Sequence, residues 1–164
     1  MSNDIKQGTL ANIGGNLLEK TVQEIFVSKG FRLLKYGDWK DSLAVYGDEL
    51  LLTNVPYTSI YGHRGTTEFL AMSAKNGFSM RIECKWQQSA GSVDEKLPYL
   101  YLNAVESMPE DWIVIIIDGG GFKEGAVEWL KNCAAEQRYS GNKAKKIQVF
   151  SLAEFMAWAN RLLR

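Results

Sequence analysis

The chain has 164 residues, of which 46% are hydrophobic and 23% charged, and its formal net charge is zero. These proportions exclude disordered and collagen-like classes, and the length suits a single domain over residues 1–164 with a sizeable core. Because no apolar run approaches the roughly 20 residues of a membrane span and residues 1–10 contain no apolar signal segment, we expect a cytoplasmic protein without a membrane partner.

The first part of the chain predicts one helix, one strand and a loop. Residues 11–29 carry apolar side chains at helical spacing, with Asn12 or Asn16 as the N-cap and Gly30 at the end. A strand over 31–36 and a loop over 37–41 are expected to follow.

Three further extended segments are expected in the middle of the chain. The first covers residues 50–60, and Pro56 places it at a sheet edge or splits it. The other two, 66–73 and 78–86, flank Asn76-Gly77, which is a strong signal for a two-residue hairpin turn.

The second half alternates helices with strands. Ser92 and Glu95 have the spacing of a capping box at a helix start, although Pro98 leaves open a start at Pro98 itself. The apolar run from Trp112 to Asp118 is typical of a central strand that is buried on both faces. The expected elements are a helix to about 106, a strand over 112–118, a helix over 124–137, a strand over 146–150 and a helix over 152–163. The sequence therefore predicts an α/β domain with a mixed central sheet flanked by helices, in the order αβββαβ followed by αβα.

Charged and apolar residues alternate in the second hairpin strand, so Arg81, Glu83 and Lys85 share one face. A two-residue turn at Asn76-Gly77 would place Glu68 opposite Lys85 and diagonal to Glu83. Two carboxylates this close repel each other unless a cation lies between them. Lys85 supplies part of that charge, and a hard divalent ion such as Mg²⁺ suits the rest, which points to phosphodiester hydrolysis. The alternative is an ordinary solvent-facing strand with cross-strand ion pairs.

The surrounding sequence resembles the PD-(D/E)XK nuclease superfamily. The resemblance is carried by Glu19, Thr67-Glu68-Phe69, Ile82-Glu83-Cys84-Lys85, Gln87-Gln88 and residues 91–96. The restriction-endonuclease-like core of that superfamily runs helix, three strands, helix, strand, which is the order expected here over about residues 12–118.

The resemblance implies a metal site with Mg²⁺, for which Mn²⁺ would substitute. Glu68 matches the first acidic ligand, Glu83 the second and Lys85 the catalytic lysine, while Cys84 would offer its backbone carbonyl to the metal. Some branches use a glutamate of the first helix, and Glu19 is the best match, with a solvent-facing helix residue as the alternative. The chain departs from the pattern because Glu68 stands where Asp is more common and Thr67 where Pro is.

Several polar residues are candidates for binding DNA, although each is also an ordinary surface residue in type. Arg64 is a reasonable phosphate contact on a glycine-containing loop, and the first helical turn after Gly91 is a favourable place for an anion. The candidates are His63, Arg64, Gln87, Gln88, Ser92 and Lys96. From Lys131 onward, seven basic residues stand against two acidic ones, which would add phosphate affinity.

Other chemistries have little support in the sequence. Two cysteines, without a CxxC pair, argue against a disulfide framework, and a single histidine excludes most zinc sites. The glycines after Asp118 do not have the spacing of a nucleotide-binding motif, so no nucleotide cofactor is expected.

The leading hypothesis is a Mg²⁺-dependent DNA endonuclease that acts as a homodimer, since cutting both strands requires two active sites. One alternative is a nucleic-acid-binding or assembly module on the same fold that performs no reaction. Another is a small protein-interaction domain whose charged hairpin contributes only ion pairs.

Overall fold

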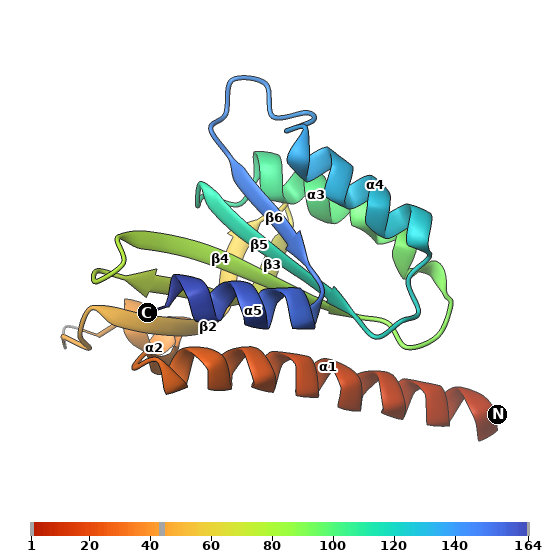
Figure 1. Ribbon diagram of the computed structural model, residues 1–164, viewed down its shortest axis with the longest axis horizontal. Helices are drawn as coiled ribbons and strands as arrows, with labels where there is room; N and C mark the ends of the chain where they lie inside the picture. Colours follow the sequence, from red (N-terminus) through yellow and green to blue (C-terminus); the bar gives the residue numbers. More distant parts are fainter. Residues whose placement is uncertain (1, 43–44, 164) are drawn as a thin grey trace.

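The computed structural model describes residues 2–42 and 45–163, in which a six-stranded mixed sheet lies between two layers of helices (Figure 1). The strands occupy the sheet in chain order; β1 is parallel to β2, β3 is antiparallel to both neighbours, and β4, β5 and β6 are parallel. This arrangement confirms the predicted α/β class with a mixed sheet. None of the helices in the described residues is long and apolar enough to cross a membrane. The elements are α1 (Ser2–Ser28), β1 (Arg32–Lys35), α2 (Tyr36–Lys40), β2 (Glu49–Thr58), β3 (Arg64–Ser73), β4 (Phe78–Trp86), the 3₁₀ helix η1 (Ser92–Lys96), α3 (Leu97–Glu106), β5 (Trp112–Asp118), α4 (Glu124–Ala135), β6 (Lys146–Phe150) and α5 (Leu152–Leu162).

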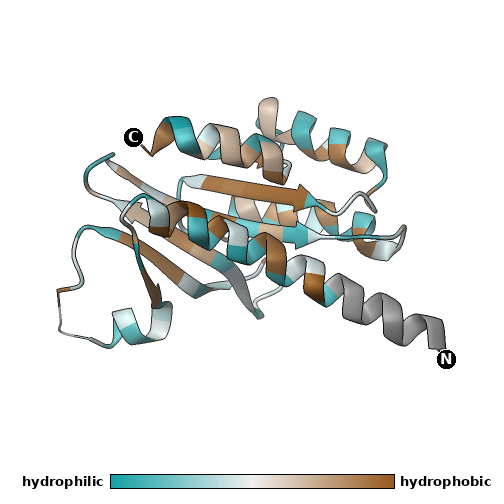
Figure 2. Ribbon diagram, turned by 60° about the horizontal axis from the view of Figure 1, so that its bottom comes forward, coloured by the Kyte–Doolittle hydropathy of each residue, from teal (hydrophilic) through white to brown (hydrophobic). Residues whose placement is uncertain are grey.

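The sheet buries both of its faces. Helices α1 and α5 cover one face, where Phe26 and Phe155 pack against Ile82 and neighbouring apolar side chains. Helices α3 and α4 cover the other face through Tyr101 and Leu130. The hydrophobic segments gather in the strands between these layers (Figure 2). Residues 113–117 of β5 are all buried, as expected for a central strand enclosed on both sides.

The N-terminal helix is longer than predicted, and the predicted loop over 37–41 is wrong. Because α1 begins at Ser2, both Asn12 and Asn16 lie inside it and cap nothing, whereas Gly30 does follow its end with φ +90°. The loop is replaced by α2, in which Tyr36 and Trp39 approach with ring centroids 5.7 Å apart and pack on the apolar residues of β2. This tertiary packing outweighs the weak local helix preference of the segment.

Pro56 neither splits β2 nor makes it an edge strand. The strand is continuous from Glu49 to Thr58 and lies between β1 and β3. However, β1 pairs only with residues 50–53 of β2, so Pro56 lies beyond the end of β1. A missing backbone N–H costs nothing at a position without a strand neighbour on that side.

The hairpin turn between β3 and β4 is wider than predicted. Ser73 pairs with Phe78, so residues 74–77 form the loop, and the Asn76 backbone N–H donates to Ser73 Oγ at 3.0 Å. Continuing this register places Glu68 opposite Glu83, so the predicted pairing with Lys85 is wrong. Because the shift amounts to two residues along β4, the charged residues of the strand keep a common face.

The capping box predicted at Ser92 is wrong. Ser92 begins η1, which has Gly91 as its N-cap without a side-chain hydrogen bond, and α3 starts at Leu97. Pro98 then lies in the first turn of α3, close to the alternative start considered from the sequence. The described chain does form a capping box at α5, between Ser151 and Glu154.

The contact between α1 and β4 predicts opposite effects for two adjacent glycines. A Cβ at Gly14 would lie 2.1 Å from the Trp86 indole, whereas one at Gly15 would have only Trp86 Cβ nearby, at 4.0 Å. Since alanine favours a helix over glycine, Gly15→Ala should raise the free energy of unfolding by about 0.5–1 kcal/mol. Gly14→Ala should lower it, because the indole must move. Urea denaturation of both variants checks this, and equal effects would contradict the close approach of α1 to Trp86.

Candidate active site

Strands β3 and β4 separate at Glu68, and this separation exposes a backbone donor to its carboxylate. The ladder between the two strands ends at the Phe69–Ile82 pair, and beyond it the Cys84 N–H donates to Glu68 Oε2 at 2.8 Å. On the other side, the register places Asn54 of β2 across from Glu68, and Asn54 has φ +55°. At this irregular part of the backbone, the Glu68 carboxylate is therefore held against β4 by the hydrogen bond that it accepts from the Cys84 N–H.

Glu83 and Lys85 form a contact pair on β4, next to Glu68. The Lys85 ammonium contacts Glu83 Oε1, while Glu83 Oε2 is buried with no hydrogen-bond partner within residues 2–42 and 45–163. Glu83 is only 4% exposed. A buried carboxylate oxygen without a partner is costly, so the site is short of one positive or hydrogen-bonding group.

The pKa values of Glu83 and Lys85 also indicate that the site lacks a positive or hydrogen-bonding group. Burial raises the pKa of Glu83 above its usual range, against the lowering effect of Lys85 and with a further rise from Glu68. Burial alone would lower the pKa of Lys85, but the Glu83 and Glu68 carboxylates outweigh it and raise that pKa to about 12. Lys85 is therefore a cation at neutral pH, held between two acidic groups.

Glu19 of α1 faces the same region from the helical layer. Burial raises the pKa of Glu19 most, repulsion from Glu68 raises it further, and Lys85 lowers it. The three side chains therefore lie within electrostatic range of one another. Glu19 and Glu68 also line a polar cavity of about 250 Å³, together with Gln23 and Asn54. Gln23 is not among the residues predicted for the site, and its only sequence signal is its position one helical turn after Glu19, on the same face of α1.

The residues at the site fit a divalent cation with two carboxylate ligands. Glu68 and Glu83 lie within electrostatic range of each other. Oε2 of Glu83, which has no hydrogen-bond partner among the described residues, is available as a ligand atom for a cation. Nowhere in the described chain do three His, Cys, Asp or Glu side chains gather closely enough to hold a metal ion. The other ligands would thus be backbone carbonyls and water, as Mg²⁺ accepts. Cys84 buries its side chain in the core, which leaves its backbone for such a role, and a ligand role for Glu19 stays a prediction.

The charged face of β4 is not solvent-exposed, so that alternative is wrong for Arg81 and Glu83. Arg81 is 2% exposed and donates to Glu110, to Thr67 Oγ1 at 2.9 Å and to Val55 O at 3.1 Å. Thr67 therefore supplies a hydroxyl acceptor to this buried network. Glu110 lies 29 positions from Arg81 and belongs to no motif, so no local pattern singles it out.

The candidate DNA-binding residues divide into one buried and five exposed positions. Gln87 is buried, and its Nε2 donates to Gly121 O at 2.8 Å, so its amide holds the loop after β5. A Cβ at Gly119 would lie 2.4 Å from Gln87 O, which explains why this loop requires glycine. The exposed positions are His63, Arg64, Gln88, Ser92 and Lys96, and their binding roles stay predictions.

The basic C-terminal segment is partly engaged within the protein. Lys131 pairs with Glu154 at 3.3 Å, and Lys145 is buried and donates to Met108 O at 2.6 Å and Glu110 O at 2.7 Å. These lysines therefore contribute less free charge toward phosphate than their number indicates.

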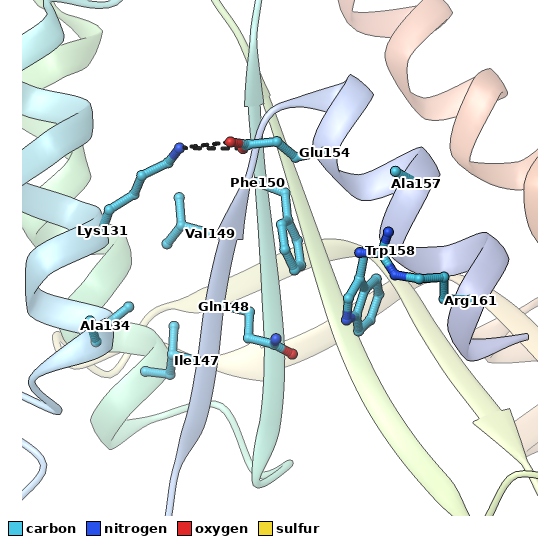
Figure 3. Close-up of a pocket in the computed structure, with 11 residues that line it drawn as sticks. Lys131, Ala134, Ile147, Gln148, Val149, Phe150, Glu154, Ala157, Trp158 and Arg161 are labelled. Carbon is cyan, nitrogen blue, oxygen red and sulfur yellow. Dashed lines mark hydrogen bonds and ion pairs between the residues drawn. The ribbon is translucent and has the colours of Figure 1, made fainter.

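The groove in Figure 3 lies elsewhere, over β6 between α4 and α5. Its volume is about 560 Å³, and the Lys131–Glu154 ion pair crosses it. None of Glu19, Glu68, Glu83 or Lys85 lines it. The groove is thus separate from the acidic site.

The sequence matches a known protein family. The sequence model described as a PD-(D/E)XK nuclease superfamily domain matches residues 10–163, nearly the whole chain. No curated protein and no solved structure matches the chain.

Proposed function

The chain belongs to the PD-(D/E)XK nuclease superfamily, and from this premise we propose that it is a Mg²⁺-dependent DNA endonuclease. The family supports a nuclease-like function. DNA as the substrate, Mg²⁺ as the cation and the individual residue roles are our proposal.

The observation that carries the proposal is the buried, incompletely compensated acidic pair beside a lysine. Glu83 is buried with Oε2 unpartnered, and Glu68 is held against β4 by the Cys84 N–H. A purely structural ion pair would gain from pairing both carboxylate oxygens. Leaving one of them free favours a site that takes up a ligand.

Glu68 and Glu83 would hold the cation, with the carbonyl of Cys84 as a further ligand. When bound, a divalent cation supplies positive charge that stabilises the phosphate as it is attacked. Asp is replaced here by Glu68, whose longer side chain reaches Cys84 N–H at 2.8 Å. That hydrogen bond fixes the direction of the carboxylate.

Lys85 would place a fixed positive charge next to the reacting phosphate. Its ammonium is held by Glu83, so little reorientation is required when negative charge develops on the phosphate oxygens. The same ammonium can donate a hydrogen bond that orients the attacking water. Glu19, which lines the polar cavity from its position on α1, would restrict how substrate and water enter.

The test is cleavage by the purified full chain. Supercoiled, linear, single-stranded and four-way-branched DNA are each incubated with Mg²⁺, with Mn²⁺ and with a chelator, and the products are separated on gels. We expect cleavage with either cation and none with the chelator. Binding without cleavage under every condition would instead support a nucleic-acid-binding module on this fold, and equal cleavage in chelator would refute the proposed chemistry.

A further inference from the structure

An exposed tyrosine, Tyr61, lies at the turn between β2 and β3 and stacks on the half-buried Tyr99 of α3. Tyr61 is 69% exposed, yet its ring stacks on Tyr99 of α3, with centroids 5.1 Å apart and planes inclined by 25°. His63 approaches the same ring edge-on at 6.5 Å. Tyr99 thus covers one side of the Tyr61 ring, while most of the Tyr61 side chain remains accessible.

Hydrogen bonds hold this turn in place. The Ser59 N–H donates to His63 O at 2.8 Å, and the Gly62 N–H returns to Ser59 O at 2.8 Å. The Ile60 N–H donates to Oδ1 of the fully buried Asn103, whose Nδ2 donates to Tyr99 O at 2.8 Å. A single buried amide therefore positions the backbone next to Tyr61 and the backbone of Tyr99. A ring fixed in this way loses little conformational entropy when a ligand stacks on it.

The tyrosine pair is connected to the acidic site through Tyr57. The Arg81 guanidinium lies 5.8 Å from the centroid of the Tyr57 ring, and Arg81 shares its face of β4 with Glu83. Burial raises the pKa of Tyr57 most, and repulsion from Glu83 and Tyr99 raises it further. Tyr57 is therefore within electrostatic range of both residues. Tyr57 also packs against the apolar cluster that contains residues of α3, the helix that carries Tyr99, and Ile115, which pairs with Glu83, so the stacked pair and Glu83 belong to the same side of the sheet.

We propose that Tyr61, supported by Tyr99, stacks on an unpaired nucleobase of the DNA whose phosphate enters the Glu68–Glu83 site. This inference rests on the proposed function and assigns its substrate class: single-stranded DNA, or duplex with a locally unpaired nucleotide. In a continuous duplex both faces of each base are covered by neighbouring bases, whereas an unpaired base has a free π face. The exposed Arg64, the first residue of β3 directly after this turn, would contact the adjoining phosphate.

The test measures binding in chelator, where no metal-dependent cleavage occurs. Fluorescence anisotropy gives the affinity for three labelled probes of equal length: single-stranded DNA, duplex DNA, and a single strand with abasic sugars in place of nucleotides. We expect Tyr61→Ala to weaken binding of the natural single strand by roughly 5- to 100-fold. Tyr61→Phe should bind as the parent does, because the ring face is kept. Tyr139→Ala, which removes another tyrosine that is 63% exposed, is the matched control and should change nothing.

The abasic probe decides between stacking and charge. If Tyr61 recognises the base, Tyr61→Ala should bind the abasic strand as tightly as the parent does. It should likewise bind the duplex as tightly as the parent does. An unchanged affinity of Tyr61→Ala for the natural strand would overturn the inference, and the ring would then suit an aromatic side chain of a protein partner. Equal loss on all three probes would also overturn it. Neither result bears on metal-dependent cleavage, so the proposed function stands or fails separately.

Discussion

Lys85→Ala is expected to reduce metal-dependent cleavage by about 10²- to 10³-fold, the usual loss when one group that stabilises transition-state charge is removed. Lys85 contacts Glu83, and the carboxylates of Glu83 and Glu68 both raise the pKa of its ammonium group. An alanine leaves the developing charge on the phosphate without this cation. Initial rates on the preferred DNA, with Mg²⁺ in excess, measure the effect.

Two comparisons separate this loss from damage to the fold. Lys131→Ala removes a lysine from an exposed ion pair with Glu154, remote from the acidic site, and should leave the rate unchanged. Lys85→Met keeps the apolar stem of the side chain, so a folded but inactive Lys85→Met protein assigns the loss to the charge. Circular dichroism and urea unfolding verify the fold of each variant. Parental rates in folded Lys85→Ala protein would contradict the role proposed for this residue.

The order of the elements and the acidic pair were accessible from the sequence because both depend on local patterns. Alternation along β4 places Glu83 and Lys85 on one face, and any even shift of register between β3 and β4 keeps Glu68 on that same face. The error at the Asn76-Gly77 turn therefore changed the neighbour of Glu68 from Lys85 to Glu83 but kept the three residues together. The break of the ladder at Asn54 and Glu68 was not accessible, because a positive φ at an asparagine has no distinctive sequence signal.

A comparison of Ser92 with Ser151 shows how the surrounding sequence decides whether a Ser-x-x-Glu sequence caps a helix. Both Ser92 and Ser151 are followed by a glutamate three residues later, yet only Ser151 forms a capping box. A helix that began at Ser92 would have Pro98 in its interior, where the ring clashes with the preceding turn. The chain avoids this clash by forming η1 first and starting α3 at Leu97.

The contacts that complete the site join residues far apart in the chain, which is why the sequence alone did not reveal them. Arg81 and Glu110 are separated by 29 positions, and Ile60 and Asn103 by 43. Neither pair belongs to a motif, and a charged residue on a strand is normally assigned to the surface. Their partners are fixed only once α3 is packed on the sheet.

Glu110→Ala is expected to lower the free energy of unfolding by about 3–5 kcal/mol, because it leaves the buried Arg81 guanidinium without its counter-charge. The Arg81 side chain is 2% exposed and that of Glu110 13%, so water cannot replace the lost carboxylate fully. Arg81 also donates to Thr67 Oγ1, next to Glu68 on β3, and to Val55 O on the adjacent strand β2. Loss of the Glu110 carboxylate should therefore disturb the position of Glu68 as well as lower the free energy of unfolding. Urea unfolding monitored by tryptophan fluorescence measures it.

Two further variants test whether burial is the cause. Glu24→Ala removes an acidic residue from an ion pair with Lys20 whose side chains are 67% and 70% exposed, and should change stability by no more than about 0.5 kcal/mol. The double variant Arg81→Met, Glu110→Leu removes both charges, so it should be more stable than Glu110→Ala alone. If Glu110→Ala cost no more than Glu24→Ala, Arg81 would have another counter-charge or would be hydrated. The cleavage rate of the double variant then shows whether the Arg81 network positions Glu68: a stable protein with reduced activity would assign it that role.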